Sequence, residues 1–286
     1  MATPHRSNFN NDSILQKRWK KFKSLKRGYY SLIILLTLYL LSFLLPILIN
    51  NRAIIVKYEQ QYFFPVITGY IPGKKFDQNV PGEAKYRSLS DKFELETNNS
   101  NWVLMPPYPF SPYEDITFEG NKMYEPPSKK HWLGTDNTGR DVFARLCYAF
   151  NISISFALLL TVVNYIVGIL IGGAMGYYGG RFDLIFQRII EVWSSLPMLF
   201  VIIIISSILK PSFLILIGIY TLVNWINMTY LMRAEFYREK SKPYVAAALS
   251  MGQSDYNVMF KHILSNSLVP IITYFPFSVV AGISAL

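Results

Sequence analysis

The stretch ISISFALLLTVVNYIVGILIGGAMGYY, residues 152–178, decides the fold class, because it carries no charge and is long enough to cross a bilayer as a helix. Glycine recurs at every fourth position towards its end and just beyond it, at Gly168, Gly172, Gly176 and Gly180. Residues four apart share one face of a helix, and small residues let helix backbones approach closely in lipid. The stretch therefore predicts a closely packed, multi-helix membrane bundle with these glycines at a helix contact.

Four further apolar runs have transmembrane length, at residues 29–49, 192–209, 212–232 and 266–286. The first contains 21 uncharged residues, which make ~30 Å of helix at ~1.5 Å per residue. It is longer than the apolar part of a signal peptide, so we interpret it as an uncleaved anchor. The last run stops at Leu286 without a polar flank, and we expect a fragment or a truncated product. The prediction is an all-α integral membrane protein with five spans.

The composition agrees with this class. Of the 286 residues, 51% are hydrophobic and 16% are charged, whereas soluble domains carry about 25% charged residues. The apolar content excludes a disordered chain or a coiled coil. Cys147 is the single cysteine, which excludes a disulfide scaffold.

The net charge of +10 is concentrated in residues 1–28, which carry +7, while residues 50–145 carry 0 and residues 146–286 carry +3. With a cytoplasmic N-terminus, the short inner segments 1–28, 177–188 and 233–263 hold eight, two and five Lys/Arg, against one in the outer loop at Lys210. This asymmetry follows the positive-inside rule. It explains the basic charge by membrane topology and leaves no reason to expect nucleic-acid binding.

Residues 1–28 combine that charge with one apolar stripe, formed by Leu15, Trp19, Phe22 and Leu25. A basic helix with such a stripe is typical of a segment lying on an anionic membrane surface. We predict a cytoplasmic basic amphipathic segment that contacts membrane lipid. A topology anchor and a regulatory lipid site are both compatible with the pattern.

Residues 50–145 hold nine of the sixteen prolines and many aromatics. Proline disfavours long helices, so we expect a compact extracytoplasmic insertion, with short strands at 53–58 and 62–67. Packing over the membrane domain and seating a partner are both compatible roles.

The motif at residues 131–141 lies near the end of this insertion. Gly134 and Gly139 have the spacing of a phosphate loop, but Arg140 and Asp141 follow where Lys and Ser/Thr are required, so we exclude nucleotide binding. The spacing also disfavours a calcium site at Asp136 and Asp141. We expect Asp136 and Thr138 to organise a turn before a helix that leads into the second span.

No catalytic or metal-binding cluster is evident. Glu191 is the one acid at the predicted spans, directly before residues 192–209, and Arg188 lies three residues away, so a local pair competes with a proton-relay role. The three histidines fall in different predicted compartments, at His5, His131 and His262.

The longest inner loop, residues 233–265, predicts two short helices. Pro243 suits the first turn of a helix and Gly252 its left-handed end. Ser254 or Asp255 then caps a second helix over 256–264. This is either an ordinary amphipathic loop or a rigid handle for a cytoplasmic partner, with Ala247 and Ala248 allowing close approach.

Several motifs resemble those of a known family. Ala247-Ala248-x-x-x-Gly252 resembles the EAA loop of ABC importer permeases, and His131-x-Leu-Gly-Thr-Asp-x-x-Gly-Arg-Asp141 with Gly176-Tyr-Tyr-Gly-Gly180 resembles the dipeptide/oligopeptide permeases. Three stretches are similar to the Yej-type permeases of microcin C and oligopeptide uptake: Arg27-Gly-Tyr-Tyr-Ser-Leu32, Glu191-Val-Trp-Ser-Ser-Leu-Pro197 and Arg233-Ala-Glu-Phe236. Two positions depart from the EAA pattern: Ala246 replaces its glutamate, and Leu264-Ser265 replaces a Leu-Pro.

The resemblance implies a type I ABC importer permease with an extracytoplasmic insertion after the first span and a sixth span beyond residue 286. It implies an inner-membrane subunit that imports oligopeptides or microcin C-type compounds and is not itself an enzyme. The implied partners are a second permease, two ATPase domains that carry ATP and Mg, and a peptide-binding protein; no cofactor is implied on this chain. The residues implied to dock the ATPases are Ala247, Ala248, Gly252, Gln253 and Asp255. The motif residues implied on the outer face are Gly134, Thr135, Asp136, Gly139, Arg140 and Asp141.

Three alternatives remain open from the sequence. A permease of the same family for nickel or another small solute would carry the same motifs. A proton-coupled peptide carrier would depend on Glu191. A structural membrane scaffold would transport nothing.

Overall fold

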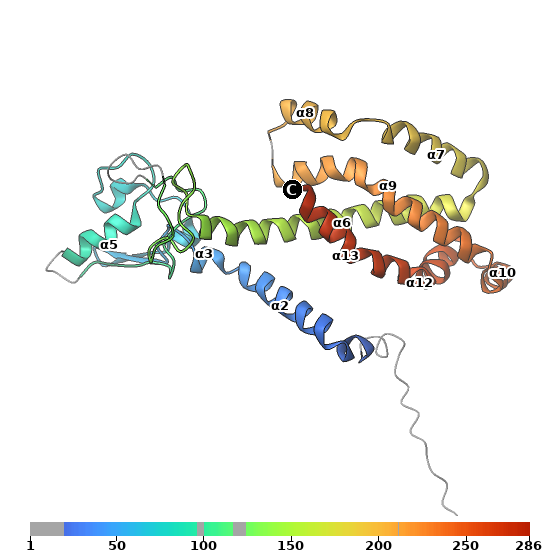
Figure 1. Ribbon diagram of the computed structural model, residues 1–286, viewed down its shortest axis with the longest axis horizontal. Helices are drawn as coiled ribbons and strands as arrows, with labels where there is room; N and C mark the ends of the chain where they lie inside the picture. Colours follow the sequence, from blue (N-terminus) through green and yellow to red (C-terminus); the bar gives the residue numbers. More distant parts are fainter. Residues whose placement is uncertain (1–19, 96–99, 117–123, 211) are drawn as a thin grey trace, which may run out of the picture. The chain divides into compact units, whose positions relative to one another are not determined.

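The computed structural model describes residues 20–95, 100–116, 124–210 and 212–286. It divides into an N-terminal unit, Met1–Asn151, and a C-terminal unit, Ile152–Leu286, whose elements are drawn in Figure 1. The division falls inside helix α6 (Val142–Tyr178), close to the predicted start of the membrane core at residue 146. Most of the predicted amphipathic segment 1–28 lies outside the described residues, which begin at Lys20.

The predicted first span, residues 29–49, is not one continuous helix. Helix α2 (Lys26–Ser42) ends before the apolar run does, and the short helix α3 (Leu45–Leu48) follows. Pro46 explains the interruption, because it has no N–H to bond the carbonyl of Ser42 and its ring would clash with that carbonyl in a continuous helix.

The insertion contains a three-stranded antiparallel sheet in the order β2-β1-β3. Its strands are β1 (Ile55–Tyr58), β2 (Gln61–Phe63) and β3 (Trp102–Leu104). Glu59 and Gln60 join β1 to β2 with φ of 46° and 63°, the backbone that a tight two-residue hairpin requires. The strand predicted at 53–58 contains β1. The strand predicted at 62–67 overlaps β2 only at its start, because Pro65 begins helix α4 (Pro65–Thr68) instead of prolonging β2. Strand β3 is not predicted from the sequence.

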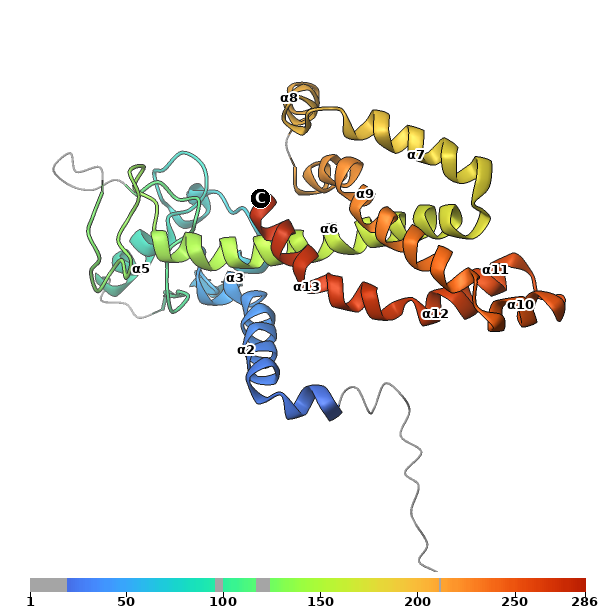
Figure 2. The same cartoon turned by 45° about the vertical axis from the view of Figure 1, so that its right-hand side comes forward.

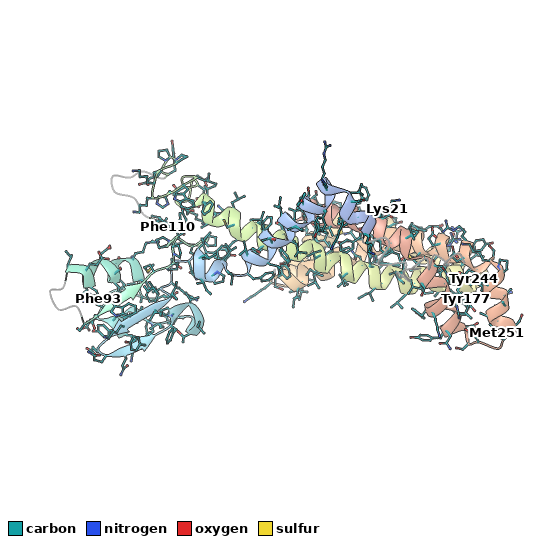
Figure 3. The ribbon with its side chains drawn as sticks, turned by 90° about the horizontal axis from the view of Figure 1, so that it is seen from below. Lys21, Phe93, Phe110, Tyr177, Tyr244 and Met251 are labelled. Carbon is teal, nitrogen blue, oxygen red and sulfur yellow. The ribbon has the colours of Figure 1, made fainter. Side chains whose placement is uncertain are left out.

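This insertion has its own small hydrophobic core. The sheet packs with the 3-10 helix η1 (Gly73–Phe76) and with α5 (Tyr86–Leu95). Val56, Phe76 and Leu89 are fully buried between them. Figure 3 labels Phe93 of this core, and Phe110 of a second cluster that contains Leu45, Tyr108 and Ala144.

The predicted turn around Asp136 is present. Asp136 Oδ1 accepts hydrogen bonds from the backbone N–H groups of Thr138 and Arg140, both at 2.9 Å, and from the Thr138 hydroxyl at 2.7 Å. Gly134 and Gly139 have φ of 72° and 79°, and a Cβ would lie 2.7 Å and 2.5 Å from a backbone oxygen. Both positions therefore require glycine.

Asp141 ends the same motif and caps α6. Its Oδ1 accepts from the Ala144 N–H at 2.8 Å, and its Oδ2 accepts from the Tyr108 hydroxyl at 2.7 Å and lies 2.8 Å from His131 Nδ1. These contacts compensate the burial of the carboxylate. The other two motif residues also bond within this unit: Thr135 to Glu125, and Arg140 to Asp115.

Three helices in the described residues are long and apolar enough to cross a membrane: α6, α9 (Phe213–Lys240) and α13 (Leu268–Ala285). A fourth candidate is the pair α7 (Gly180–Ser194) and α8 (Met198–Ile208), which is bent by 75°. The predicted third span, residues 192–209, is therefore interrupted, and Pro197 at the break is the physical reason. By length and apolar composition, the described helices account for three to four of the five predicted spans.

The glycine ridge of α6 packs against α9. A Cβ at Gly168 would lie 2.6 Å from Met228 Cβ, one at Gly172 would overlap the Thr229 carbonyl oxygen, and one at Gly176 would lie 2.5 Å from the Arg233 carbonyl oxygen. Gly180 differs, because α6 ends at Tyr178 and the described residues place no atom within 4 Å of its added Cβ. The ridge thus has three members, and Gly180 belongs to the turn into α7.

Helix α13 contacts α6 at a second small-residue site. A Cβ at Gly282 would lie 3.0 Å from Ala157, and the Tyr165 hydroxyl lies 3.0 Å from Ser278 Oγ. Figure 2 shows α6, α9 and α13 as the central helices of the C-terminal unit.

We predict that Gly172→Ala destabilises the C-terminal unit by ~1–3 kcal/mol, because the new methyl group forces α6 and α9 apart. The matched control is Gly218→Ala on α9, where the described residues leave the added Cβ open space. Thermal unfolding of the purified protein in detergent measures both. Equal transition temperatures for the two variants would contradict the close packing.

We also predict acid sensitivity of the turn before α6. Burial raises the pKa of Asp136, but the hydrogen bonds from Arg140 and Thr138 and the charge of Arg145 outweigh it and lower the pKa to about 2. Because the pKa is lower in the folded state, the stabilisation is complete above the ordinary value of 3.8 and is lost as the pH falls towards 2. Amide hydrogen exchange at Thr138 and Arg140, corrected for intrinsic rates, should lose protection over that range. An identical loss in Asp136→Asn would refute the assignment.

Candidate functional site

The candidate site is the segment between α9 and α13. It consists of α10 (Pro243–Ser250), α11 (Asp255–Asn257), the π-helix η2 (Val258–Ile263) and α12 (Leu264–Asn266). Pro243 occupies the first turn of α10, Gly252 follows that helix with φ of 77°, and Ser254 Oγ caps α11 by accepting from the Asn257 N–H. The predicted helix–glycine–helix pattern is present.

One face of this segment is buried against the ends of the long helices. Val245, Val258 and Ile263 are 1% exposed or less and belong to the same cluster as Met232 and Phe236 of α9. Phe236 in turn packs on the α6 backbone at Gly173 and Gly176. The segment is therefore attached to the α6–α9 contact through a continuous apolar cluster.

Two polar links join the segment to the end of α6. The Tyr177 hydroxyl donates to Asp255 Oδ1 at 2.6 Å. Lys240, the last residue of α9, donates from Nζ to the Tyr177 carbonyl oxygen, and its ammonium lies 5.1 Å from the centre of the Tyr177 ring. The ends of α6 and α9 and the start of α11 are thus connected through one tyrosine.

A buried carboxylate fixes the junction between α9 and α10. Glu239 is 1% exposed and accepts hydrogen bonds from Lys242 Nζ at 2.6 Å and from the Tyr244 hydroxyl at 2.9 Å. Burial, together with the hydrogen bond to Glu239, raises the pKa of Tyr244 to about 12, so its hydroxyl stays protonated and donates at neutral pH. Figure 3 shows Tyr177, Tyr244 and Met251 at the same end of the C-terminal unit.

The structure separates the five predicted docking residues into two groups. Ala247, Gly252 and Asp255 are exposed. Ala248 is 2% exposed and packs in the buried cluster, because it follows Val245 by three residues on the same helix face. Gln253 is half-buried, and its Oε1 lies 2.7 Å from His262 Nε2. Ala248 therefore lies beneath the surface, and the expectation that it allows a partner to approach closely stays a prediction.

Sequence reasoning missed three exposed apolar side chains around Gly252. Leu249, Met251 and Tyr256 are 42%, 72% and 70% exposed. We call these three residues the apolar tip. Exposed apolar patches mark interaction surfaces. The sequence carries one signal for this patch: its residues lie off the helix face that contains the buried Val245 and Ala248.

A further missed contact joins α7 to α9. Arg233 donates from Nε and Nη2 to the two carboxylate oxygens of Asp183, both at 2.6 Å. This fork geometry gives strong, well-oriented ion pairs. Glu191, by contrast, is exposed and pairs with Arg188 one helical turn away, which matches the local-pair interpretation.

Comparison with known proteins identifies similar chains. A family model described as "Binding-protein-dependent transport system inner membrane component" matches residues 166–286. The chain is 39% identical to the inner membrane ABC transporter permease protein YejE of Escherichia coli, over 95% of this chain and 79% of that protein. It is 34% identical to the peptidoglycan transport system permease protein YejE of Agrobacterium fabrum, over 95% of this chain and 76% of that protein. The dipeptide transport system permease protein DppC of Bacillus subtilis is 34% identical over 61% of this chain and 55% of its own length.

We predict that Tyr177→Phe loosens the segment without unfolding it. A hydrogen bond to a charged group contributes ~1.5–3 kcal/mol, so amide exchange of residues 251–258 should accelerate by roughly tenfold or more. Tyr178→Phe is the matched control, because Tyr178 is adjacent and 53% exposed. Unchanged exchange in Tyr177→Phe would show that the Tyr177–Asp255 bond does not hold the segment.

Proposed function

The chain belongs to the family of ABC transporter permeases, and we propose that it is the permease subunit of an ATP-driven importer that moves oligopeptides or peptide-like compounds, of the microcin C type, across the inner membrane. Its relatives carry names that refer to dipeptide and peptidoglycan transport, which supports the peptide-like substrate class. Permeases of this family are membrane transport components, so the chain is not an enzyme.

The proposed complex contains partners that supply energy and substrate. A second, homologous permease completes the path through the membrane, and two ATPase domains bind ATP and Mg and hydrolyse the nucleotide. A peptide-binding protein delivers substrate to the outer face. Nucleotide-binding residues are not needed on this chain, because its role is to convert ATPase movement into helix movement.

The proposed orientation places the N-terminus and residues 233–265 in the cytoplasm, and the insertion 50–145 outside. The charge distribution supports it, with +7 in residues 1–28. Lys20 and the basic residues that follow it would then contact the lipid headgroups of the inner leaflet.

The observation that carries the docking proposal is the apolar tip. Leu249, Met251 and Tyr256 offer apolar contact area around the left-handed turn at Gly252, with Ala247 and Asp255 beside them. Ala248 and Gln253 lie beneath this surface, where Ala248 packs in the buried cluster and Gln253 contacts His262. An ATPase domain with an apolar groove would seat the tip, much as exposed apolar anchors seat in pockets at other interfaces.

In the proposed cycle, ATP binding brings the two ATPase domains together and displaces the docked segment. The Tyr177–Asp255 bond and the cluster around Phe236 pass that displacement to α6 and α9 as one rigid body. The bundle then changes from inward-facing to outward-facing, as in other rigid-body transitions.

We predict that Met251→Asp uncouples the importer. The charge is placed on a side chain that is 72% exposed, so the fold is retained, while burying an unpaired carboxylate against the ATPase disfavours docking. Uptake of a labelled oligopeptide by the reconstituted complex should fall at least about tenfold, since one buried charge costs several kcal/mol. Leu95→Asp, at a position 86% exposed in the insertion, is the matched control.

The same assay tests the transport function itself. Wild-type uptake should require ATP and persist when an uncoupler abolishes the proton gradient. Uptake of nickel but not of peptide would favour the small-solute alternative, and loss of uptake with the uncoupler would favour a proton-coupled carrier.

A further inference from the structure

A small cavity lies among α6, α9 and α13 in the C-terminal unit. It has a volume of about 90 Å³, and every side chain that lines it is uncharged. The polar members come from all three helices: Thr161, Asn164 and Tyr165 from α6, Asn224 and Asn227 from α9, and Tyr274 and Ser278 from α13. A neutral, amide-rich cavity inside an otherwise apolar bundle needs a physical reason, because polar groups in membrane spans are costly and often functional.

Asn164 is the residue that points to a ligand. It is 8% exposed, and its carboxamide oxygen is buried with no hydrogen-bond partner among the residues that the structure describes. Native proteins rarely leave such an acceptor unmet. The described part of the protein therefore provides no donor for this oxygen.

Three of the neighbouring polar groups already have partners. Asn224 Nδ2 donates to the Tyr220 carbonyl oxygen at 2.9 Å. The Tyr165 hydroxyl and Ser278 Oγ bond each other at 3.0 Å. Thr161, Asn227 and Tyr274 also line the cavity, but none of them donates to Asn164 Oδ1 among the described residues, so this oxygen is left for a donor that enters the cavity.

The size and chemistry of the cavity limit what can enter. Its volume of about 90 Å³ corresponds to roughly three water molecules, well below the roughly 300 Å³ of a pocket that encloses a whole small ligand. One peptide group fits such a space. A peptide N–H is the donor that a carboxamide oxygen accepts, and an uncharged lining does not discriminate among the charges of the side chains attached to it.

We infer that Asn164 forms a subsite that accepts a main-chain N–H of the translocating peptide, with Asn227 at the exposed side of the same cavity. This inference rests on the proposed transport function. It gives that function a recognition principle: the path binds the feature that all peptides share, and therefore accepts many sequences.

The test uses the complete reconstituted importer and compares a peptide with a series of its analogues. Each analogue carries one N-methyl group, at a different main-chain nitrogen. The wild type should take up one of the methylated analogues with a KM raised roughly two- to tenfold, the range that one neutral hydrogen bond gives. In Asn164→Leu that discrimination should disappear. The peptide-binding protein is the same in both complexes, so its own discrimination between the two peptides contributes equally to each. For each complex, the KM of the methylated peptide is divided by the KM of the unmodified peptide. Dividing the wild-type value by the Asn164→Leu value isolates the contribution of Asn164.

Thr221→Val is the matched control, since the Thr221 hydroxyl on α9 also has no partner among the described residues but does not line the cavity. It should keep the wild-type discrimination. Asn164→Ala serves as a second variant that differs from leucine in volume.

Two results would overturn the inference. If Asn164→Leu and Asn164→Ala keep the wild-type discrimination against every methylated analogue, the carboxamide binds water only. If neither variant assembles with its partners, the carboxamide serves the fold. A wild-type complex that transports no peptide in the presence of ATP contradicts the proposed function instead, and this is a separate arm of the same assay.

Discussion

The close approach of α6 and α9 is the constraint on which the rest of the C-terminal unit depends. Lipid is as apolar as the helices, so burial in the bundle gains little, and contact between backbones supplies the attraction instead. That contact exists only because Gly168, Gly172 and Gly176 have no side chain, and the Thr229 carbonyl occupies the space that a methyl group at Gly172 would need. The same approach brings Phe236 onto the α6 backbone, and the cavity beside Asn164 lies between these two helices and α13.

The position of the segment that follows α9 depends on its contacts with this helix pair. Its buried face joins the cluster around Phe236, its junction is fixed by the satisfied carboxylate of Glu239, and Tyr177 connects it to the end of α6. Displacing such a segment alone would break several buried contacts, each of which is costly to lose. This is the physical basis for treating the apolar tip and the α6–α9 pair as one body that a partner moves.

Local patterns in the sequence predict much of this architecture, and non-local contacts account for what they miss. Pro243 and Gly252 mark the limits of α10 because their backbone preferences act within a few residues. The break at Pro46 has an equally local cause, because proline cannot continue a helix. The hydropathy of residues 29–49 does not reveal this break, since the run is apolar throughout. The Tyr177–Asp255 bond, the inward position of Ala248 and the end of the glycine ridge before Gly180 depend on how distant elements pack. No periodicity within one segment encodes those contacts.

The docking segment and the α6–α9 pair should move together during transport, and a distance measurement between them checks this. Spin labels at Lys261, an exposed position of η2 outside the apolar tip, and at Leu170, an exposed position on α6, would be introduced after Cys147→Ser in the assembled transporter. A second label pair across the two permeases would report that ATP has switched the complex. One narrow Lys261–Leu170 distance distribution is expected, the same with and without ATP. A shift or broadening of that distribution on ATP binding would contradict their joint movement.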